Sequence, residues 1–167
     1  MAIRIEPLRK QHDRRGFACG EPGLDDWFMH RASQDARRDL AQVFVAIDDQ
    51  LGLVGFYSLS AFSLELNDLP EDLAKKLPRY HAIPAALIGR LARDLRARGQ
   101  RIGDILLADA IRRVLDARKR LGVYAIVVDA LTETAGDFYQ SFGFTPLPSR
   151  PDRLFLLTAM AERAFGP

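Results

Sequence analysis

The chain has 167 residues, of which 24 are basic and 22 acidic, and its formal net charge is +2. This length suits one domain with a buried core, so we expect a single domain over residues 1–167. A net charge so near zero neither requires nor excludes a nucleic-acid partner, so the positions of the arginines matter more than their number. Cys19 is the only cysteine, which excludes an intramolecular disulfide and favours the cytoplasm.

The sequence shows no pattern typical of a metal site or of a membrane-spanning segment. His12, His30 and His81 are far apart in the sequence and form no zinc-type spacing with the cysteine, so we expect no metal site. No apolar run approaches the length of a membrane span, and the N-terminus lacks the pattern of a signal peptide. We therefore expect no membrane partner.

Patterns of apolar residues predict the elements of the first half of the chain. In residues 24–40 apolar side chains recur at steps of three and four, which indicates one amphipathic helix. Two apolar runs separated by the turn Asp-Asp-Gln-Leu-Gly indicate a β-hairpin. We expect a strand at 3–7, a loop at 11–23, a helix at 24–40, and hairpin strands at 43–47 and 53–66.

The second half of the chain alternates strands with helices, which argues for an α/β fold with one mixed central sheet flanked by helices. Residues 123–128 are continuously apolar, as in a strand covered on both faces. Gly143 is placed to end the helix before it in a left-handed conformation. We expect helical turns at 70–77, a strand beginning at Pro84, helices at 102–120 and 133–142, and a last strand at 154–157.

The most informative stretch is residues 87–107, which predict an apolar strand, a short turn rich in arginine and glycine, and the start of a helix. Such a turn leaves free N–H groups at the positive end of the helix dipole, where phosphate groups bind. Neither the dinucleotide motif G-x-G-x-x-G nor a P-loop motif occurs here. An ordinary turn, in which the glycines only relieve backbone strain, explains these residues equally well.

Residues 98–103, Arg-Gly-Gln-Arg-Ile-Gly, resemble the signature Gln/Arg-x-x-Gly-x-Gly/Ala of the GNAT family of N-acetyltransferases. In that family the signature follows the fourth strand and cradles the pyrophosphate of acetyl-CoA. Arg98 and Gly103 match its first and last positions, whereas Arg101 replaces its first glycine and would either crowd the phosphates or add an ion pair to them. The resemblance implies a cofactor site formed by Leu91, Ala92 and Arg93 on the strand and by Arg98, Gly99, Gln100, Arg101, Ile102, Gly103 and Asp104 in the turn.

Over nearly its whole length, the chain also resembles the acetyltransferase toxins of bacterial type II toxin–antitoxin modules. Such toxins acetylate the α-amino group of the amino acid on charged tRNA, which stops translation, and a ribbon-helix-helix antitoxin neutralises them. The resemblance implies the same substrate, cosubstrate and partner here, together with a homodimer. The matching blocks include Leu24-Asp-Asp-Trp27, Gly55-Phe-Tyr-Ser-Leu-Ser60, Leu73-Ala-Lys-Lys-Leu-Pro-Arg-Tyr80, Leu87-Ile-Gly-Arg-Leu-Ala92, Phe138-Tyr-Gln-Ser-Phe-Gly-Phe144 and Arg153-Leu-Phe155.

Acyl transfer from a thioester to an amine needs a neutral amine, a polarised carbonyl group and a proton for the departing thiolate. By the resemblance, backbone N–H groups of residues 91–93 would polarise the carbonyl group and Tyr139 would lie near the sulfur. A phenol with a pKa of about 10 is protonated at neutral pH and can donate that proton. The alternative for Tyr139 is a packed aromatic between Phe138 and Phe142. The candidates for a general base, both more commonly solvated residues, are Glu65 and Glu133.

A tRNA partner would contact clustered cations through its phosphates. Residues 67–84 contain three prolines and are expected to form a surface excursion that carries three of the candidate cations. For any one cation, a solvated surface charge is the alternative. The candidates for tRNA binding are Arg37, Arg38, Lys75, Lys76, Arg79 and Arg90.

Two other functions stay open on the sequence. A housekeeping N-acetyltransferase would acetylate a small amine or a protein N-terminus. A non-enzymatic CoA-binding module would follow if Arg101 prevented productive binding of the cofactor.

Overall fold

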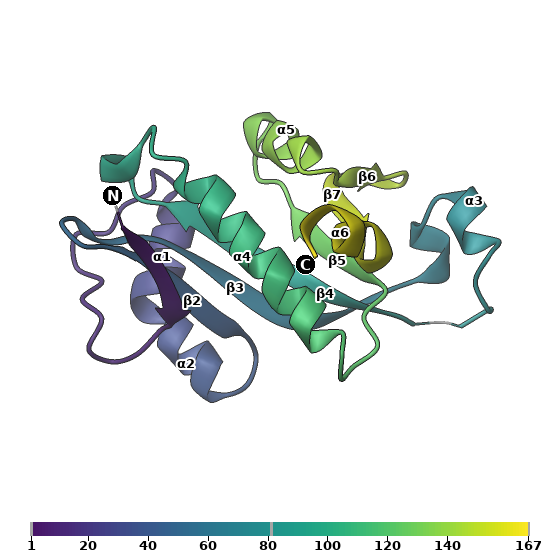
Figure 1. The fold of residues 1–167 in the computed structure, drawn as a ribbon, viewed down its shortest axis with the longest axis horizontal. Coiled ribbons are helices and arrows are strands. Elements are labelled where there is room, and N and C mark those ends of the chain that lie inside the picture. Colours follow the sequence, from purple (N-terminus) through teal and green to yellow (C-terminus); the bar gives the residue numbers. More distant parts are fainter. Residues whose placement is uncertain (1, 81, 167) are drawn as a thin grey trace. The chain divides into compact units, whose positions relative to one another are not determined.

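The computed structural model of this chain describes residues 2–80 and 82–166, so His81 lies outside the described residues. Its strands form a seven-stranded sheet in the order β1-β2-β3-β4-β5-β7-β6 (Figure 1). β4 and β5 pair in parallel, while β1–β2, β2–β3, β5–β7 and β6–β7 are antiparallel, which confirms the mixed sheet of an α/β fold. The strands are β1 Ile3–Pro7, β2 Gln42–Asp48, β3 Gly52–Leu64, β4 Ile83–Arg93, β5 Ala125–Asp129, β6 Thr145–Leu147 and β7 Arg150–Leu157.

The chain divides into two compact units, and β3, β4 and the longest helix each run through both. One unit comprises residues 1–60 and 89–110, and the other comprises residues 61–88 and 111–167. None of the helices in the described part of the chain has the length and apolar character needed to cross a membrane. The helices are α1 Pro22–His30, α2 Ala32–Arg37, α3 Glu71–Ala74, α4 Ile102–Ala117, α5 Glu133–Ser141 and α6 Thr158–Phe165, with 3-10 turns η1 Leu66–Asp68 and η2 Leu95–Ala97.

The first unit has an aromatic core that holds α1 on the hairpin of β2 and β3. Phe28 of α1 is fully buried and stacks on Phe56 of β3, with ring centroids 4.2 Å apart and an interplanar angle of 6°. Trp27 and Phe17 pack against the same Phe56 ring at 5.9 Å and 5.5 Å. Because aromatic side chains each bury about 150–250 Å², this cluster is the main apolar contact that seats the helix.

The single helix expected over residues 24–40 is wrong, since two helices occupy this region. Arg31 has φ −124° and ψ −24°, which ends α1 and begins α2. Its N–H donates to the carbonyl oxygen of Trp27, and its own carbonyl oxygen accepts from Asp35. The Trp27 indole N–H also donates to the Asp35 carboxylate at 2.9 Å, which ties the two helices together. The apolar repeat continues through this break and therefore does not reveal it.

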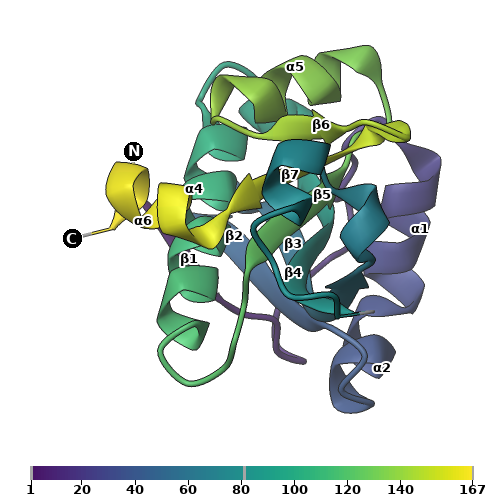
Figure 2. The ribbon, with the colours of Figure 1, turned by 90° about the vertical axis from the view of Figure 1, so that its right-hand side faces the viewer.

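The second unit is organised around β5. Ala125, Ile126, Val127 and Val128 are fully buried, which confirms the expected strand with both faces covered. Figure 2 shows α5 lying over β6 and β7. Gly143, with φ +98°, donates to the carbonyl oxygen of Gln140 and ends α5 in the expected left-handed conformation.

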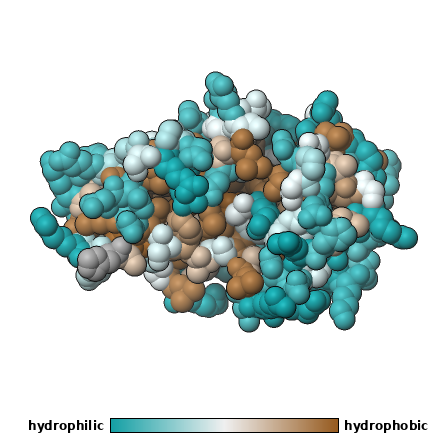
Figure 3. Space-filling model, turned by 180° about the vertical axis from the view of Figure 1, so that it is seen from behind, coloured by the Kyte–Doolittle hydropathy of each residue, from teal (hydrophilic) through white to brown (hydrophobic). Residues whose placement is uncertain are grey.

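Several large apolar residues of the described chain are exposed. Hydrophilic residues cover most of the face drawn in Figure 3, with apolar surface between them. Some exposed apolar surface is ordinary for a folded protein. Tyr80 differs from the others because it lines a cavity. The exposed large apolar residues are Leu40, Tyr80, Leu95, Ile105, Leu121, Leu131 and Met160.

Candidate active site

The turn between η2 and α4 has the backbone of an anion site. Gly99 has φ +84° and Arg101 has φ +59°, so the chain turns sharply just before α4 begins at Ile102. The carbonyl oxygen of Arg101 accepts the first helical hydrogen bond, from Ile105. No described residue accepts from the N–H groups of residues 101–104. These groups lie at the positive end of a 16-residue helix, where an anion is favoured.

Arg101 is tied to the first turn of α4. Its Nε and Nη2 atoms both lie 2.8 Å from Oδ2 of Asp104, and its side chain is 82% exposed. The guanidinium group therefore stays beside the free N–H groups and offsets the negative charge of Asp104 there. The left-handed backbone of Arg101 costs roughly 1–2 kcal/mol, and glycine would avoid that cost. This explains why a glycine is usual at this position of the family signature.

The turn fits a diphosphate group with an attached chain that can donate hydrogen bonds. An added Cβ at Gly99 would meet nothing within 4 Å, so the space beside this residue is open. Oε1 of Gln100 is buried and has no hydrogen-bond partner among the described residues. Because an unpaired buried acceptor is costly, a ligand with N–H or O–H groups would stabilise it.

The N-terminus of α4 is seated on the sheet at Gly55 of β3. A Cβ at Gly55 would lie 2.8 Å from Cδ1 of Leu106, and 3.1 Å from both the Ala92 carbonyl oxygen and Cγ2 of Ile102. A side chain at this position would force Leu106, Ile102 and the Ala92 carbonyl group to shift. Gly55 therefore helps to set where the first turn of α4 lies relative to the end of β4.

Asp94 is a positioning residue that the sequence analysis missed. Its buried carboxylate accepts hydrogen bonds from the N–H groups of Ala18, at 3.1 Å, and Arg96, at 2.8 Å. The Arg96 Nε donates to the same carboxylate at 2.9 Å, and the Asp94 N–H donates to the Val54 carbonyl oxygen. These bonds fix the path from β4 into η2 and hence into the Arg98–Asp104 turn. An Asp directly after a predicted strand, where it can cap a turn, is the sequence signal that could have identified Asp94.

The proposed pantetheine-binding residues lie at the end of β4. β4 pairs with β5 from Ala85 to Ile88 and then continues to Arg93. Ala92 is buried in the core of the first unit, whereas Leu91 and Arg93 are partly exposed. Residues 89–93 of β4 thus extend beyond the part of the strand that pairs with β5.

Tyr139 is a buried residue of α5 with a hydroxyl group that no described residue binds. Its ring packs edge-on against Phe144 at 5.8 Å and against Phe138 at 5.3 Å. Burial, together with the negative charge of Asp129, raises the pKa of Tyr139 to about 12. The ring is therefore packed, but against Phe138 and Phe144 rather than between Phe138 and Phe142, while the hydroxyl group stays protonated and has no described partner.

Asp129 and Arg153 form an ion pair that the sequence analysis did not predict. Nε and Nη2 of Arg153 lie 2.7 Å and 2.9 Å from the two carboxylate oxygens of Asp129. The guanidinium group also lies 4.8 Å from the ring centroid of Phe62. A carboxylate held by both oxygens is a poor general base, so Asp129 acts on Tyr139 through its charge.

Neither glutamate considered as a general base has an arrangement that supports this role. Glu65 is exposed at the start of η1, where its N–H donates to the Asp68 carboxylate at 2.9 Å, and Glu133 is exposed in the first turn of α5.

The candidate tRNA-binding cations lie in three places in the chain. Arg37 and Arg38 are exposed at the end of α2 and have no described partner. Arg90 of β4 stacks on Trp27, with Cζ 4.1 Å from the ring centroid, so it is less available. The structure brings the other three together on the excursion between β3 and β4, as Lys75, Lys76 and Arg79.

Comparison with known families identifies the class of protein. Residues 39–146 match the acetyltransferase (GNAT) domain family. This match covers more than half of the chain, so the protein belongs to the GNAT acetyltransferases, as Arg98 and Gly103 suggested.

Related proteins narrow the class to one group of acetyltransferases. The chain is 34% identical over 171 residues to the probable toxin TacT of Sinorhizobium fredii, a match that covers 97% of this chain and 94% of that protein. It is 36% identical over 154 residues to the tRNA-acetylating toxin of Mycobacterium tuberculosis, a match that covers 92% and 91% of the two chains.

Solved structures of similar toxins share the fold along almost their whole length. A mutant of KacT in which phenylalanine replaces a tyrosine matches with a TM-score of 0.92 and 30% identity, over 99% of this chain and 100% of that one. AtaT complexed with acetyl-methionyl-tRNAfMet matches at 0.90 and 30% identity, over 98% and 99% of the chains. A mutant of AtaT bound to the C-terminus of the antitoxin AtaR and to acetyl-CoA matches at 0.82 and 27% identity, over 99% of both.

Proposed function

We propose that this protein transfers the acetyl group of acetyl-CoA to the α-amino group of aminoacyl-tRNA, blocks translation, and is the toxin of a type II toxin–antitoxin pair. The observation that carries this proposal is the match, over 98% of the chain, to AtaT complexed with acetyl-methionyl-tRNAfMet. The relatives from two organisms, both named as toxins, support the same function.

Acetyl-CoA supplies the activated acetyl group in this proposal, and no metal takes part. The free N–H groups of residues 101–104 bind its pyrophosphate, and Arg98 and Arg101 add positive charge. Gly99 leaves the space open, and Gln100 accepts a hydrogen bond from the bound molecule. The backbone of Leu91, Ala92 and Arg93 binds the pantetheine chain and polarises the thioester carbonyl group.

Tyr139 is the general acid of the reaction in this proposal. The amine nitrogen attacks the carbonyl carbon, the new C–N bond forms, and the C–S bond breaks. The departing thiolate takes the proton of the Tyr139 hydroxyl, while the nitrogen releases one proton to water and the phenolate regains one. An amine beside an ester carbonyl is less basic than an ordinary amine, so it reacts without a dedicated base.

The tRNA binds through exposed cations. Arg37, Arg38, Lys76 and Arg79 have no described partner and are free to contact phosphates. Lys75 pairs with Glu71 at 3.6 Å and exchanges that exposed partner for phosphate at little cost. Arg90, which stacks on Trp27, contributes a further contact.

We also propose the partners that the relatives suggest. A ribbon-helix-helix antitoxin binds and neutralises the protein, and two copies of the chain form a homodimer in the cytoplasm. The bound antitoxin AtaR in a similar structure supports the first part of this proposal. Residues 1–167 act together as one N-acetyltransferase domain.

A substrate comparison tests this function directly. The protein is incubated with acetyl-CoA and, separately, with charged tRNA, uncharged tRNA, free amino acids and a peptide N-terminus, and the products are analysed by mass spectrometry. We expect one acetyl group on the amino acid of charged tRNA and none on uncharged tRNA. Acetylation of the free amine or peptide with charged tRNA untouched would show a housekeeping N-acetyltransferase instead.

A further inference from the structure

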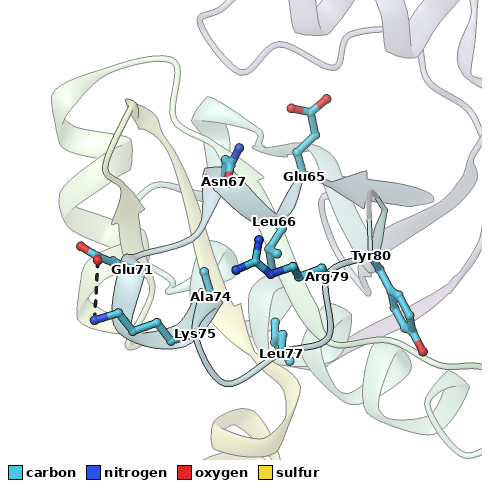
Figure 4. Close-up of a pocket in the computed structure, with 9 residues that line it drawn as sticks. All are labelled: Glu65, Leu66, Asn67, Glu71, Ala74, Lys75, Leu77, Arg79 and Tyr80. Carbon is cyan, nitrogen blue, oxygen red and sulfur yellow. Dashed lines mark ion pairs between the residues drawn. The ribbon is translucent and has the colours of Figure 1, made fainter.

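A cavity of about 670 Å³ lies in the second unit, on the excursion between β3 and β4 (Figure 4). It is formed by η1, α3 and the segment that leads into β4. Neither Tyr139 nor any residue of the Arg98–Asp104 turn lines it. The lining includes charged, amide, apolar and aromatic side chains, among them Glu65, Asn67, Lys75, Leu77, Arg79 and Tyr80.

Arg79 supplies an uncommitted positive charge inside this cavity. Figure 4 shows its side chain reaching into the middle of the cavity, beside Leu66. Its guanidinium group has no hydrogen-bond or ion-pair partner among the described residues, whereas Arg96 and Arg153 each hold a carboxylate. A planar guanidinium with free N–H groups is well suited to a phosphate.

Tyr80 supplies an aromatic face at the rim of the same cavity. Tyr80 is 63% exposed, and its side chain has no ring or hydrogen-bond partner among the described residues. Figure 4 shows the ring extending outward from the cavity wall, next to Arg79 in the chain. Proteins bind unpaired nucleotides by stacking their bases on such exposed aromatic rings.

The charges around the cavity favour a single strand over a duplex. Two carboxylates, Glu65 and Glu71, balance Lys75 and Arg79, so a continuous row of phosphates would meet repulsion as well as attraction. A single nucleotide strand places one phosphate at the guanidinium group and turns its base edges toward side-chain acceptors. The amide of Asn67 has no described partner and can bond to such an edge.

We propose that this cavity holds the unpaired nucleotides just before the terminal one at the 3′ end of the tRNA substrate, with a base stacked on Tyr80, a phosphate on Arg79 and a base edge against Asn67. This inference rests on the proposed function, because it names the part of the tRNA that this surface receives. It assigns Tyr80 and Asn67 to substrate binding and gives Arg79 a contact with the single strand.

The first test compares two tRNAs that differ only at the 3′ end. Dissociation constants are measured for intact tRNA and for the same tRNA lacking its unpaired 3′ nucleotides. We expect Tyr80→Ala to weaken binding of intact tRNA about tenfold, within the range for loss of one base–aromatic stack. We expect Tyr80→Ala to leave binding of the truncated tRNA unchanged, and Tyr80→Phe to bind both as the wild type does.

The second test measures the salt dependence of tRNA binding, which detects a phosphate contact at Arg79. We expect Arg79→Gln to make the slope of log K against log salt concentration shallower by about 0.7, as for one single-strand phosphate. Arg163→Gln is the matched control, because Arg163 is exposed on α6 and likewise has no described partner. This control should leave the slope unchanged.

Two results would overturn the inference. Equal weakening of both tRNAs by Tyr80→Ala would show that the ring does not contact the 3′ end. No weakening of either tRNA would show that the cavity serves another occupant, such as a protein partner. If the wild type acetylates charged tRNA in the same experiment, either result leaves the proposed function standing; if it does not, the function itself fails.

Discussion

Arg101 and Asp104 form an ion pair across the first turn of α4, with two guanidinium nitrogens 2.8 Å from one carboxylate oxygen. The pair holds a cation beside the free N–H groups of the helix start, on a backbone with φ +59°. The residue that departs from the family signature is therefore strained in its backbone but favourably placed in its side chain.

Replacing Arg101 separates the effect of its strained backbone on stability from the effect of its side chain on cofactor binding. We expect Arg101→Gly to raise the melting temperature by about 2 °C, because relief of backbone strain outweighs the greater entropy of the unfolded chain. We expect its dissociation constant for acetyl-CoA to rise about three- to tenfold, since a charge near the pyrophosphate is lost. Calorimetry checks both values, and tighter binding by the variant would show that the arginine obstructs the site.

Asp94 should matter for both stability and cofactor binding. We expect Asp94→Ala to lower the free energy of unfolding by about 2–3 kcal/mol, because the Ala18 N–H and the Arg96 guanidinium lose their acceptor. The KM for acetyl-CoA should rise more than kcat falls, since η2 leads into the pyrophosphate turn. Denaturant unfolding and steady-state kinetics check this. An unchanged KM would show that Asp94 contributes to stability but not to cofactor binding.

The pH dependence of stability gives a further check on Asp94. Burial alone would raise the pKa of Asp94, but hydrogen bonds from Arg96 and Ala18 outweigh burial and leave that pKa below its usual value. A carboxyl group with a lowered pKa contributes stability above its unfolded pKa of about 3.9 and loses it as the pH falls. We expect the wild type to lose more stability than Asp94→Ala between about pH 5 and pH 3.

Gly55 should tolerate no side chain. We expect Gly55→Ala to cost about 1–3 kcal/mol of stability, because the new Cβ would press on Leu106, Ile102 and the Ala92 carbonyl oxygen. Gly23→Ala is the matched control, since an added Cβ in that part of α1 meets nothing within 4 Å. Thermal melts of the two variants check this, and equal melting temperatures would contradict the close packing of α4 on β3.

The raised pKa of Tyr139 predicts a flat alkaline profile. Burial and the charge of Asp129 raise this pKa to about 12, so the acid form persists as the pH rises. We expect no loss of the acetylation rate from about pH 7 to about pH 9.5, in initial rates corrected for hydrolysis of the aminoacyl ester. A fall in rate within this range would mean that another acid protonates the thiolate.

The strands and the position of the cofactor turn could be predicted from local sequence, whereas long-range pairs could not. Apolar runs and alternation gave β1, β2 and β5 almost to the residue, because their signals lie within the strands themselves. The break at Arg31 is absent from the periodic pattern. α6 begins at Thr158, directly after Leu157, which supplies no capping side chain, and β6 has only three residues, so neither has a strong local signal.

The same limit applies to the candidate active site. The glycines and arginines of residues 98–104 are consecutive, and so their pattern could be recognised. The partners of Asp94 include Ala18, and Asp129 is held by Arg153 from another strand. Pairs of this kind depend on strand register, which a single sequence does not specify. Arg90 shows the same limit, because it was expected to contact tRNA, whereas in the structure it stacks on Trp27, a partner far away in the sequence.

The most direct measurement is the single-turnover rate of acetyl transfer to charged tRNA, followed by mass spectrometry, for the wild type and Tyr139→Phe. We expect the wild type to form N-acetyl-aminoacyl-tRNA, and the variant to bind acetyl-CoA equally well but to react about 10²- to 10⁴-fold more slowly. If the wild type leaves charged tRNA unmodified, or if the variant reacts at the wild-type rate, the central claim is contradicted.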